Sequence, residues 1–377
     1  NQSPRNCYQC LSKDEKVIMA DGSRKLISEI KIGDQVVTVN PYTCEQSIAN
    51  VINQYVKSTD KNIISLTTLN GSKLVCTDDH PILTNKGWMK AGLISGTDLI
   101  CVTPKQKYYP LDKKDTIITE EQFITICLSK GIKESLVKKH ASELDSLNLL
   151  PLKQDSNNAA ILARIIGFCM TDGSANVYRE QPQVQMSLGS YEGGLEYLND
   201  LESLGFNKNS LSESVGELHG VIHHGWNCVY NNALASLVIS LGVYLGKKTE
   251  GPTPELPEWI KNGSKLVKRE FLSGFQGGDG CKIRYNNLKN RKSPNFILNT
   301  TSQQKCMEHL DSLINRMNLL KDLFSEFDVK CKEVYVKKCD EYNDRYNVYL
   351  PFECSRDNII NYFENIGYRY DHHKIKE

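Results

Sequence analysis

The sequence predicts a multidomain protein in which an all-β module is followed by an α+β domain. Two observations support this. Short apolar runs separated by turn residues fill residues 14–102, a pattern typical of short β-strands. From residue 158 onward helical stretches alternate with strand-like ones, and a motif at the end of one helix recurs at the end of another. Such a recurrence indicates an internal repeat.

Length and composition set limits on function. The chain has 377 residues, enough for two or three domains. Lys and Arg number 46 against 45 Asp and Glu, so nucleic-acid binding would depend on local basic patches. No apolar run approaches the roughly 20 residues of a bilayer-spanning helix, so no membrane partner is expected. The 13 cysteines are an odd number and favour a reducing compartment. We expect no structural zinc, because the CxxC at Cys7 and Cys10 has no second ligand pair.

Local patterns divide the chain further. Asp21-Gly22 separates two apolar runs, which predicts a β-hairpin. Residues 103–158 become Lys-rich and helical, with Thr119 and Gln122 as a candidate capping box. We therefore expect four segments, namely 1–9, 10–105, a small helical insert at 106–157, and 158–377.

The first chemical pattern joins Cys10 to Thr77 and His80, which follow a strand of the β module. A thiolate is a strong nucleophile, and histidine exchanges protons near neutral pH. Taken singly, Cys10 reads as a small buried residue, and Thr77 and His80 as the bounds of a turn.

The whole pattern is more specific. Cys10 opens the module, the phrases KVIMADGS and IKIGDQVVTV follow, and Gly71 precedes Thr77. This resembles the N-terminal half of an intein splicing domain, the Hint fold, over residues 10 to about 102. The resemblance implies that the Cys10 sulfur attacks the carbonyl of Gln9. His80 would protonate the departing amide nitrogen. Thr77 would donate hydrogen bonds that stabilise the oxyanion or distort the scissile amide, and no cofactor would be needed.

Residues 1–9 read NQSPRNCYQ. This segment resembles the second-largest subunit of eukaryotic or archaeal-type DNA-directed RNA polymerases. The resemblance implies a host polymerase subunit as the flanking partner (extein), and a location in the nucleus, or otherwise inside the cell. It also implies that the chain is a fragment whose Hint module lacks its C-terminal strands.

The second chemical pattern is the repeated helix end. Gly167 precedes Asp172 by five residues, and Gly274 precedes Asp279 in the same way. Glycines let two helix backbones approach closely, which would bring the two carboxylates together. Paired carboxylates repel unless a cation lies between them, so the pattern predicts Mg2+ or Mn2+. One copy alone would be an ordinary helix end.

The two copies resemble the paired motifs of LAGLIDADG homing endonucleases, an αββαββ repeat with two pseudo-symmetric halves. The resemblance implies a monomeric endonuclease that cleaves double-stranded DNA, here the intein-less host gene. The family usually carries a lysine just before a Pro-x-aromatic-Ile element. Here Pro257 has no such lysine before it, and Lys248, further upstream, is the candidate catalytic lysine. Cleavage is therefore expected to be weakened or lost.

DNA contact has a local signal of its own. Residues 281–292 contain five cations and no acid, which would neutralise phosphates; the cations are Lys282, Arg284, Lys289, Arg291 and Lys292. Polar alternation at Gln181–Gln185 and Asn299–Thr301 would present side chains to base edges.

The expected function is an intein fragment within an RNA polymerase second-largest subunit, combining protein splicing at Cys10 with metal-dependent cleavage of double-stranded DNA. Three alternatives remain: a splicing-incompetent, endonuclease-degenerate remnant, a stand-alone DNA endonuclease with a Hint scaffold, and a hedgehog-like autoprocessing protein. A purely structural protein is the residual class.

Overall fold

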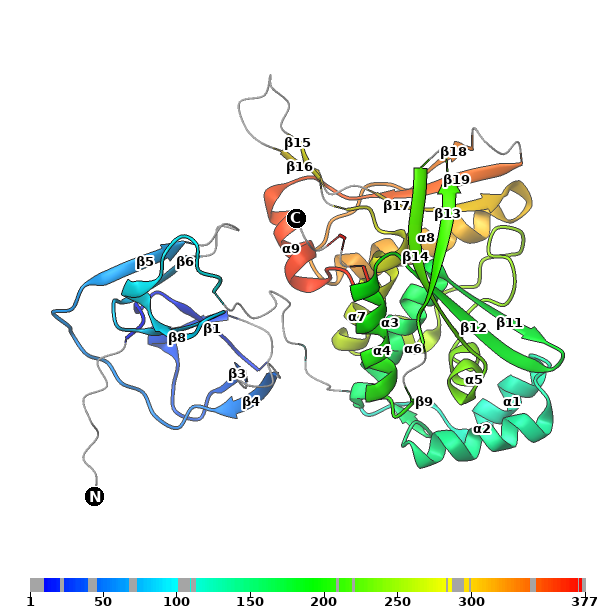
Figure 1. Ribbon diagram of the computed structural model, residues 1–377, viewed down its shortest axis with the longest axis horizontal. Coiled ribbons are helices and arrows are strands. Elements are labelled where there is room, and N and C mark those ends of the chain that lie inside the picture. The colour runs from blue at the N-terminus through cyan, green and yellow to red at the C-terminus, as the bar shows by residue number, and fades with distance from the viewer. Residues whose placement is uncertain are drawn as a thin grey trace. The chain divides into compact units, whose positions relative to one another are not determined.

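The computed structural model consists of two compact units, residues 1–110 and 111–377 (Figure 1). It describes residues 10–20, 24–39, 46–67, 73–100, 109, 113–207, 210–218, 221–282, 284–286, 295–297, 300–339, 344–371 and 373–374. No helix in these ranges is long and apolar enough to cross a bilayer. The finer division into four segments stays a prediction.

The described residues of unit 1 form four antiparallel strand pairs. The pairs are β1 (Lys16–Ile18) with β2 (Arg24–Leu26), β3 (Gln35–Val39) with β4 (Gln46–Asn50), β5 (Ile63–Thr67) with β6 (Lys73–Thr77), and β7 (Pro81–Thr84) with β8 (Gly87–Lys90). Two short 3-10 turns, η1 (Ile27–Glu29) and η2 (Ala91–Leu93), follow β2 and β8. A small apolar core surrounds Cys76, Ile82 and Ala91. The expected all-β character and the β1–β2 pairing are both present.

Unit 2 begins with the expected helical segment. It contains α1 (Glu120–Ser129) and α2 (Glu134–Ser146), flanked by the paired strands β9 (Thr116–Ile118) and β10 (Leu152–Lys153). The predicted capping box is confirmed, because Thr119 accepts from the Gln122 N–H and Gln122 accepts from the Thr119 N–H. The start of α1 and its two cap bonds thus follow from local sequence alone.

The rest of unit 2 is mixed α/β. Its first part contains α3 (Asn157–Asp172), β11 (Gly173–Tyr178), β12 (Gln181–Leu188), α4 (Tyr191–Ser203), β13 (Ser212–Leu218), β14 (Val221–Tyr230), α5 (Ala233–Ser240) and α6 (Glu258–Lys261). Its second part contains α7 (Lys265–Asp279), β15 (Arg284–Asn286), β16 (Asn295–Ile297), β17 (Thr300–Cys306), η3 (Met307–His309), α8 (Leu310–Ser325), β18 (Tyr335–Lys338), β19 (Arg345–Pro351) and α9 (Arg356–Asn365).

Two antiparallel sheets flank a central helix pair. Helices α3 and α7 pack along each other at the centre of unit 2 (Figure 1). One sheet has the order β11-β12-β14-β13 and contacts α3, and the other has the order β17-β19-β18 and contacts α7. Strands β15 and β16 form a separate hairpin. This layout places the ends of α3 and α7 between two sheets.

Candidate functional site: a carboxylate pair at two helix ends

Glycine fixes the crossing of α3 and α7. A Cβ at Gly167 would collide with the carbonyl oxygen of Phe271, and a Cβ at Gly274 would collide with that of Arg164. At each glycine, the backbone of the other helix therefore occupies the space that a side chain would need. At the ends of the helices, a Cβ at Gly278 would collide with the Thr171 hydroxyl. The predicted close approach of the two helices is present.

Asp172 and Asp279 are the last residues of α3 and α7. Burial raises the pKa of Asp279 to about 7, and the negative charge of Asp172 adds to this rise. Burial also raises the pKa of Asp172, which Lys374 and Lys248 oppose. The two carboxylates therefore interact electrostatically, as expected of a pair that shares one site.

Two lysines cap the same helix ends. The Lys248 ammonium donates to the carbonyls of Cys169 (2.8 Å) and Thr171 (2.7 Å), and also to that of Gly173. Lys248 is placed there because Leu245 forms a β-bridge with Ala175 beside α3. Burial lowers the pKa of Lys248. The sequence prediction thus located Lys248 at the site, and its catalytic role stays a prediction.

Lys374 occupies the corresponding place on α7. Its ammonium donates to the carbonyls of Gly277 and Gly278, both at 2.6 Å, and to that of Gln276 at 3.3 Å. A cation at a helix C-terminus offsets the partial negative charge of the terminal carbonyls. Sequence reasoning missed Lys374, which lies far along the chain from α7.

A buried chain of hydrogen bonds holds Asp279. Arg316 on α8 donates to the Gln303 side-chain oxygen at 2.6 Å, and the Gln303 amide donates to the Asp279 carboxylate. Arg316 is 5% exposed, and burial lowers its pKa to about 10 although Asp279 acts in the opposite direction. Both residues were missed. A signal for Arg316 existed, because it interrupts the apolar face that Leu313 and Met317 define on α8.

Two cavities meet at the helix ends. The first, about 590 Å³, is lined by Asp172 and by Ser174, Asn176 and Ser187 of the four-stranded sheet. The second, about 310 Å³, is lined by Asp279, Arg316, Lys305, and by Ser302, Gln304 and Asn347 of the three-stranded sheet. Thr171, Lys248 and Thr249 line both. Each carboxylate thus faces a cavity that continues onto one sheet.

The donor set suits a hard divalent cation that keeps part of its water shell. No cluster of three His, Cys, Asp or Glu side chains exists among the described residues, so the protein alone offers no closed cage. Mg2+ is commonly bound by one or two carboxylates, with water and substrate phosphate oxygens completing the shell. Asp172 and Asp279 fit this requirement.

The faces of the sheets carry the polar residues expected there. On β12, Gln181, Gln183 and Ser187 are exposed, Gln185 is half-buried, and the alternate residues Pro182, Val184 and Met186 are buried. Asn176 of β11 pairs with Gln183 on the same face. The segment Asn299–Thr301 does not match in the same way, because Thr301 is buried and Asn299 lies outside the described residues.

The predicted basic segment is mostly outside the described residues. Lys282 is half-buried, and Arg284 belongs to β15 without a described side chain. Lys289, Arg291 and Lys292 are not described. The role of this segment in DNA binding stays a prediction.

In unit 1 the structure brings Cys10 and Thr77 together. The Cys10 N–H donates to the Thr77 hydroxyl at 3.1 Å, and the Thr77 N–H donates to the Cys10 carbonyl at 3.0 Å. The His80 N–H donates to the Thr77 carbonyl at 3.0 Å, and burial lowers the pKa of the His80 imidazole. Gln9 lies outside the described residues.

Comparison with curated proteins gives relatives of low identity, and no family model matches the chain. The tRNA-splicing ligase RtcB of Methanopyrus kandleri is 29% identical over 84% of this chain and 31% of that protein. The DNA-directed RNA polymerase III subunit rpc2 of Dictyostelium discoideum is 25% identical over 78% of this chain and 20% of that protein. The chain spans about a third of the length of the ligases that it matches.

Similar solved structures include homing endonucleases and inteins. The homing endonuclease I-WcaI bound to its DNA recognition sequence covers 54% of this chain and 79% of its own, with a TM-score of 0.34 and 15% identity. I-DmoI in complex with DNA and Mn covers 55% and 95%, with a TM-score of 0.32 and 10% identity. The DnaB intein from Synechocystis sp. PCC 6803 covers 24% and 67%, with a TM-score of 0.23 and 23% identity. Likeness at this level carries no conclusion about activity.

These findings correct the function expected from the sequence. Five of the relatives are tRNA-splicing ligases, whereas the expected function was a splicing intein fragment with homing-endonuclease activity in a polymerase subunit. That assignment is contradicted and is not retained. Ligase activity is not assigned either, because this chain covers only about a third of each ligase. That this chain is itself an enzyme stays a proposal, because it covers only about a third of each ligase that it matches.

Proposed function

We propose that unit 2 is a divalent-metal-dependent phosphoryl-transfer enzyme acting on phosphodiester bonds of double-stranded DNA. The observation that carries this proposal is the convergence of Asp172 and Asp279 at two cavities, each continuous with the polar face of a sheet. Duplex DNA is favoured because its major groove admits β-strands, whereas the major groove of duplex RNA is too narrow for side chains to read.

The roles of the residues follow from their contacts. Asp172 and Asp279 would hold Mg2+ or Mn2+, which supplies charge neutralisation at a phosphoryl group. Arg316 and Gln303 fix the orientation of Asp279. Lys248 holds the end of α3 and adds positive charge beside both carboxylates. Lys305, 2% exposed, adds another cation to the wall of the second cavity.

We also propose that the two parts of unit 2 are structural duplicates. The reciprocal contacts of Gly167 and Gly274 support this, as do the two lysine caps, Lys248 on α3 and Lys374 on α7. Both parts continue from the central helix into antiparallel strands and a further helix. A duplicated site would treat the two strands of a duplex in equivalent ways.

The proposal is tested by measuring metal binding and DNA strand breakage or joining with the full chain. Mn2+ binding measured by electron paramagnetic resonance should weaken at least tenfold in Asp172→Asn and in Asp279→Asn, since each removes a ligand charge. The control Glu134→Gln removes an exposed carboxylate on α2 and should bind as the wild type does. Supercoiled DNA with Mg2+ should show strand breakage or joining that both site variants lose. Unchanged Mn2+ affinity in both variants would refute the proposal.

A second candidate concerns unit 1. We propose that Cys10 is a reactive thiol, with Thr77 as its hydrogen-bonding partner and His80 as a nearby base. The contact that favours this is the 3.1 Å bond from the Cys10 N–H to the Thr77 hydroxyl. Alkylation by iodoacetamide, followed by mass spectrometry, should slow several-fold at Cys10 in His80→Gln, while the exposed Cys354 reacts unchanged. Equal rates in both proteins would refute it.

A further inference from the structure

A segment after α9 passes between two helices that belong to different parts of unit 2. We call residues 366–371 and 373–374 the strap. The Arg369 N–H donates to the Ser273 carbonyl of α7 at 3.1 Å. The Tyr370 N–H donates to the Glu196 carboxylate of α4 at 3.0 Å. The strap therefore joins α4 to α7.

Glycines make room for the strap on both helices. A Cβ at Gly277 of α7 would collide with the Arg369 carbonyl oxygen, and a Cβ at Gly193 of α4 would collide with the Tyr370 carbonyl oxygen. Tyr370 has φ = 63°, a left-handed conformation that residues other than glycine keep only where their surroundings impose it. The surfaces of α4 and α7 therefore fit the backbone of the strap in this conformation.

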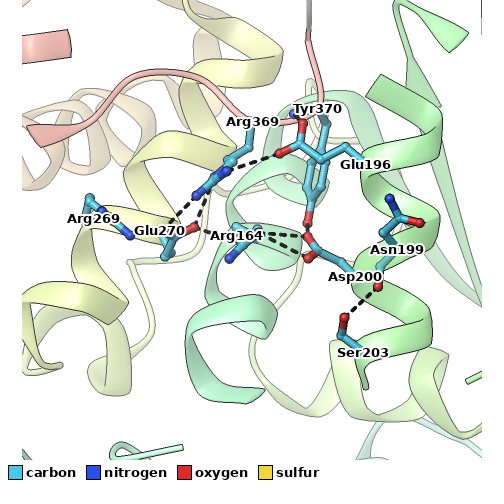
Figure 2. Close-up of polar contacts among 9 residues, drawn as sticks. All are labelled: Arg164, Glu196, Asn199, Asp200, Ser203, Arg269, Glu270, Arg369 and Tyr370. Carbon is cyan, nitrogen blue, oxygen red and sulfur yellow. Dashed lines mark hydrogen bonds and ion pairs between the residues drawn. The ribbon is translucent and has the colours of Figure 1, made fainter. Parts of the chain in front are cut away.

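Side chains of the strap enter a buried network of charges (Figure 2). Arg369 pairs with Glu270 of α7 (3.3 Å) and with Glu196 of α4 (3.4 Å). Arg164 of α3 reaches the same Glu270 at 2.8 Å and Asp200 of α4 at 3.2 Å. Burial would raise the pKa of Glu270, but the surrounding arginines hold it well below its ordinary value. Glu270 is therefore ionised at neutral pH.

The Tyr370 side chain adds further contacts between the strap and helices α3 and α4. Its hydroxyl donates to Asp200, and its ring meets Phe168 edge-on at 5.4 Å and Tyr197 at 5.3 Å. These rings come from α3 and α4. Arg369 and Tyr370 together thus contact three helices, α3, α4 and α7.

The strap ends at that site. Lys374 lies four residues beyond Tyr370 and donates to three carbonyls at the end of α7. It also pairs with Asp371 of the strap at 3.3 Å. Its positive charge lowers the pKa of Asp172, against the effect of burial, and a divalent cation bound by that carboxylate must act against the same charge.

We propose that the strap is a positioning device, in which the seating of Arg369 and Tyr370 places the Lys374 ammonium at the carboxylate pair and thereby limits the affinity of that pair for divalent cations. Arg369 and Tyr370 are positioning residues that act through Lys374. The inference rests on the proposed cation site at Asp172 and Asp279.

Coupled substitutions test this in the full chain. By Mn2+ titration, Lys374→Met should tighten the Kd by about tenfold, the effect of removing one neighbouring charge. Arg369→Gln should shift the Kd in the same direction, and the double variant should show no further gain, because both changes remove the same ammonium. The control Lys247→Met removes an exposed lysine of the first cavity, and its effect should add to that of Arg369→Gln. Additive effects of Lys374→Met and Arg369→Gln would overturn the proposal.

A second measurement is independent of metal. Acetylation of Lys374 by an amine-reactive reagent, followed by mass spectrometry, should be several-fold faster in Arg369→Gln, and Arg369→Lys should restore part of the protection. Tyr370→Phe loses only the bond to Asp200 and serves if circular dichroism shows that Arg369→Gln does not fold. Unchanged acetylation of Lys374 in the folded variants would overturn the proposed positioning role of the strap. If the wild type bound no Mn2+, only the proposed function would be refuted. The acetylation rate of Lys374 would still show whether the strap positions its ammonium group.

Discussion

A single buried side chain, that of His140, should make the stability of this protein depend on pH. His140 on α2 is 3% exposed, and its Nδ1 lies 2.7 Å from the Ser236 hydroxyl on α5. Burial, aided by the charge of Lys139, lowers the pKa of His140 to about 4. The fold therefore accommodates the neutral imidazole, and protonation favours the unfolded chain.

The free energy of unfolding should consequently depend on pH below neutrality. Because the folded pKa lies below the unfolded value, the contribution of His140 is fully present above about pH 6.5 and declines as the pH falls toward 4. Over this window the loss should be about 2 to 3 kcal/mol. Denaturant unfolding of His140→Asn at several pH values should lack this component. His224→Asn, at an exposed position, should retain it, and a slope common to both variants would contradict the prediction.

At the scale of elements, the α3–α7 crossing depends on the absence of two side chains. The carbonyl oxygens of Phe271 and Arg164 occupy the space where a Cβ would lie at Gly167 and Gly274. Backbone groups cannot rotate away as a long side chain can, so a methyl group must separate the helices.

Gly167→Ala and Gly274→Ala should each lower the free energy of unfolding by about 2 kcal/mol or more. Denaturant titration measures this directly. The control is Gly189→Ala, where a Cβ would meet nothing within 4 Å, and a change below about 0.5 kcal/mol is expected. Equal effects at all three positions would show that glycine loss, and not the helix contact, is responsible.

The sequence predicted those features of unit 2 that have local signals. The repeated spacing from Gly167 to Asp172 and from Gly274 to Asp279 located both helix ends, and the capping box located the start of α1. Lys248 was found because it lies near a recognisable Pro-x-aromatic-Ile element.

Residues that approach the site only through tertiary contacts were missed. Gln303 donates to Asp279, and Lys374 donates to the last carbonyls of α7. Both come from distant parts of the chain, and no local pattern links them to the site. Strands β11, β13 and β14 were also not singled out. Their pairing depends on partners elsewhere in the sheet, which local propensity does not encode.

At the scale of the whole molecule, the exposed residues of two strands from the two sheets, β12 and β18, differ in charge. The exposed face of β12 carries uncharged Gln181, Gln183 and Ser187. On the three-stranded sheet, Lys337 of β18 pairs with Asn347 of β19, a residue of the second cavity. The net charge of the chain is only +1, so such local cations would carry the electrostatic part of DNA binding.

The two faces should therefore respond differently in DNA binding. Lys337→Met should weaken binding to all duplex sequences alike and reduce the salt slope of log K by about 1. Gln183→Ala should leave the slope unchanged and alter the preference between sequences. Fluorescence anisotropy of labelled duplexes over a range of KCl concentrations measures both. A smaller slope for Gln183→Ala than for Lys337→Met would contradict this division.

The strap has a consequence for biosynthesis. Its bonds to α4 and α7 join residues 174 and 99 positions apart, so both helices must be made and packed before residues 369 and 370 can take their places. Contacts with such long separations form late, because a large loop must close first. A growing polypeptide on the ribosome would thus present the two acidic helix ends without their last counter-charge, and only completed synthesis of this region would supply it.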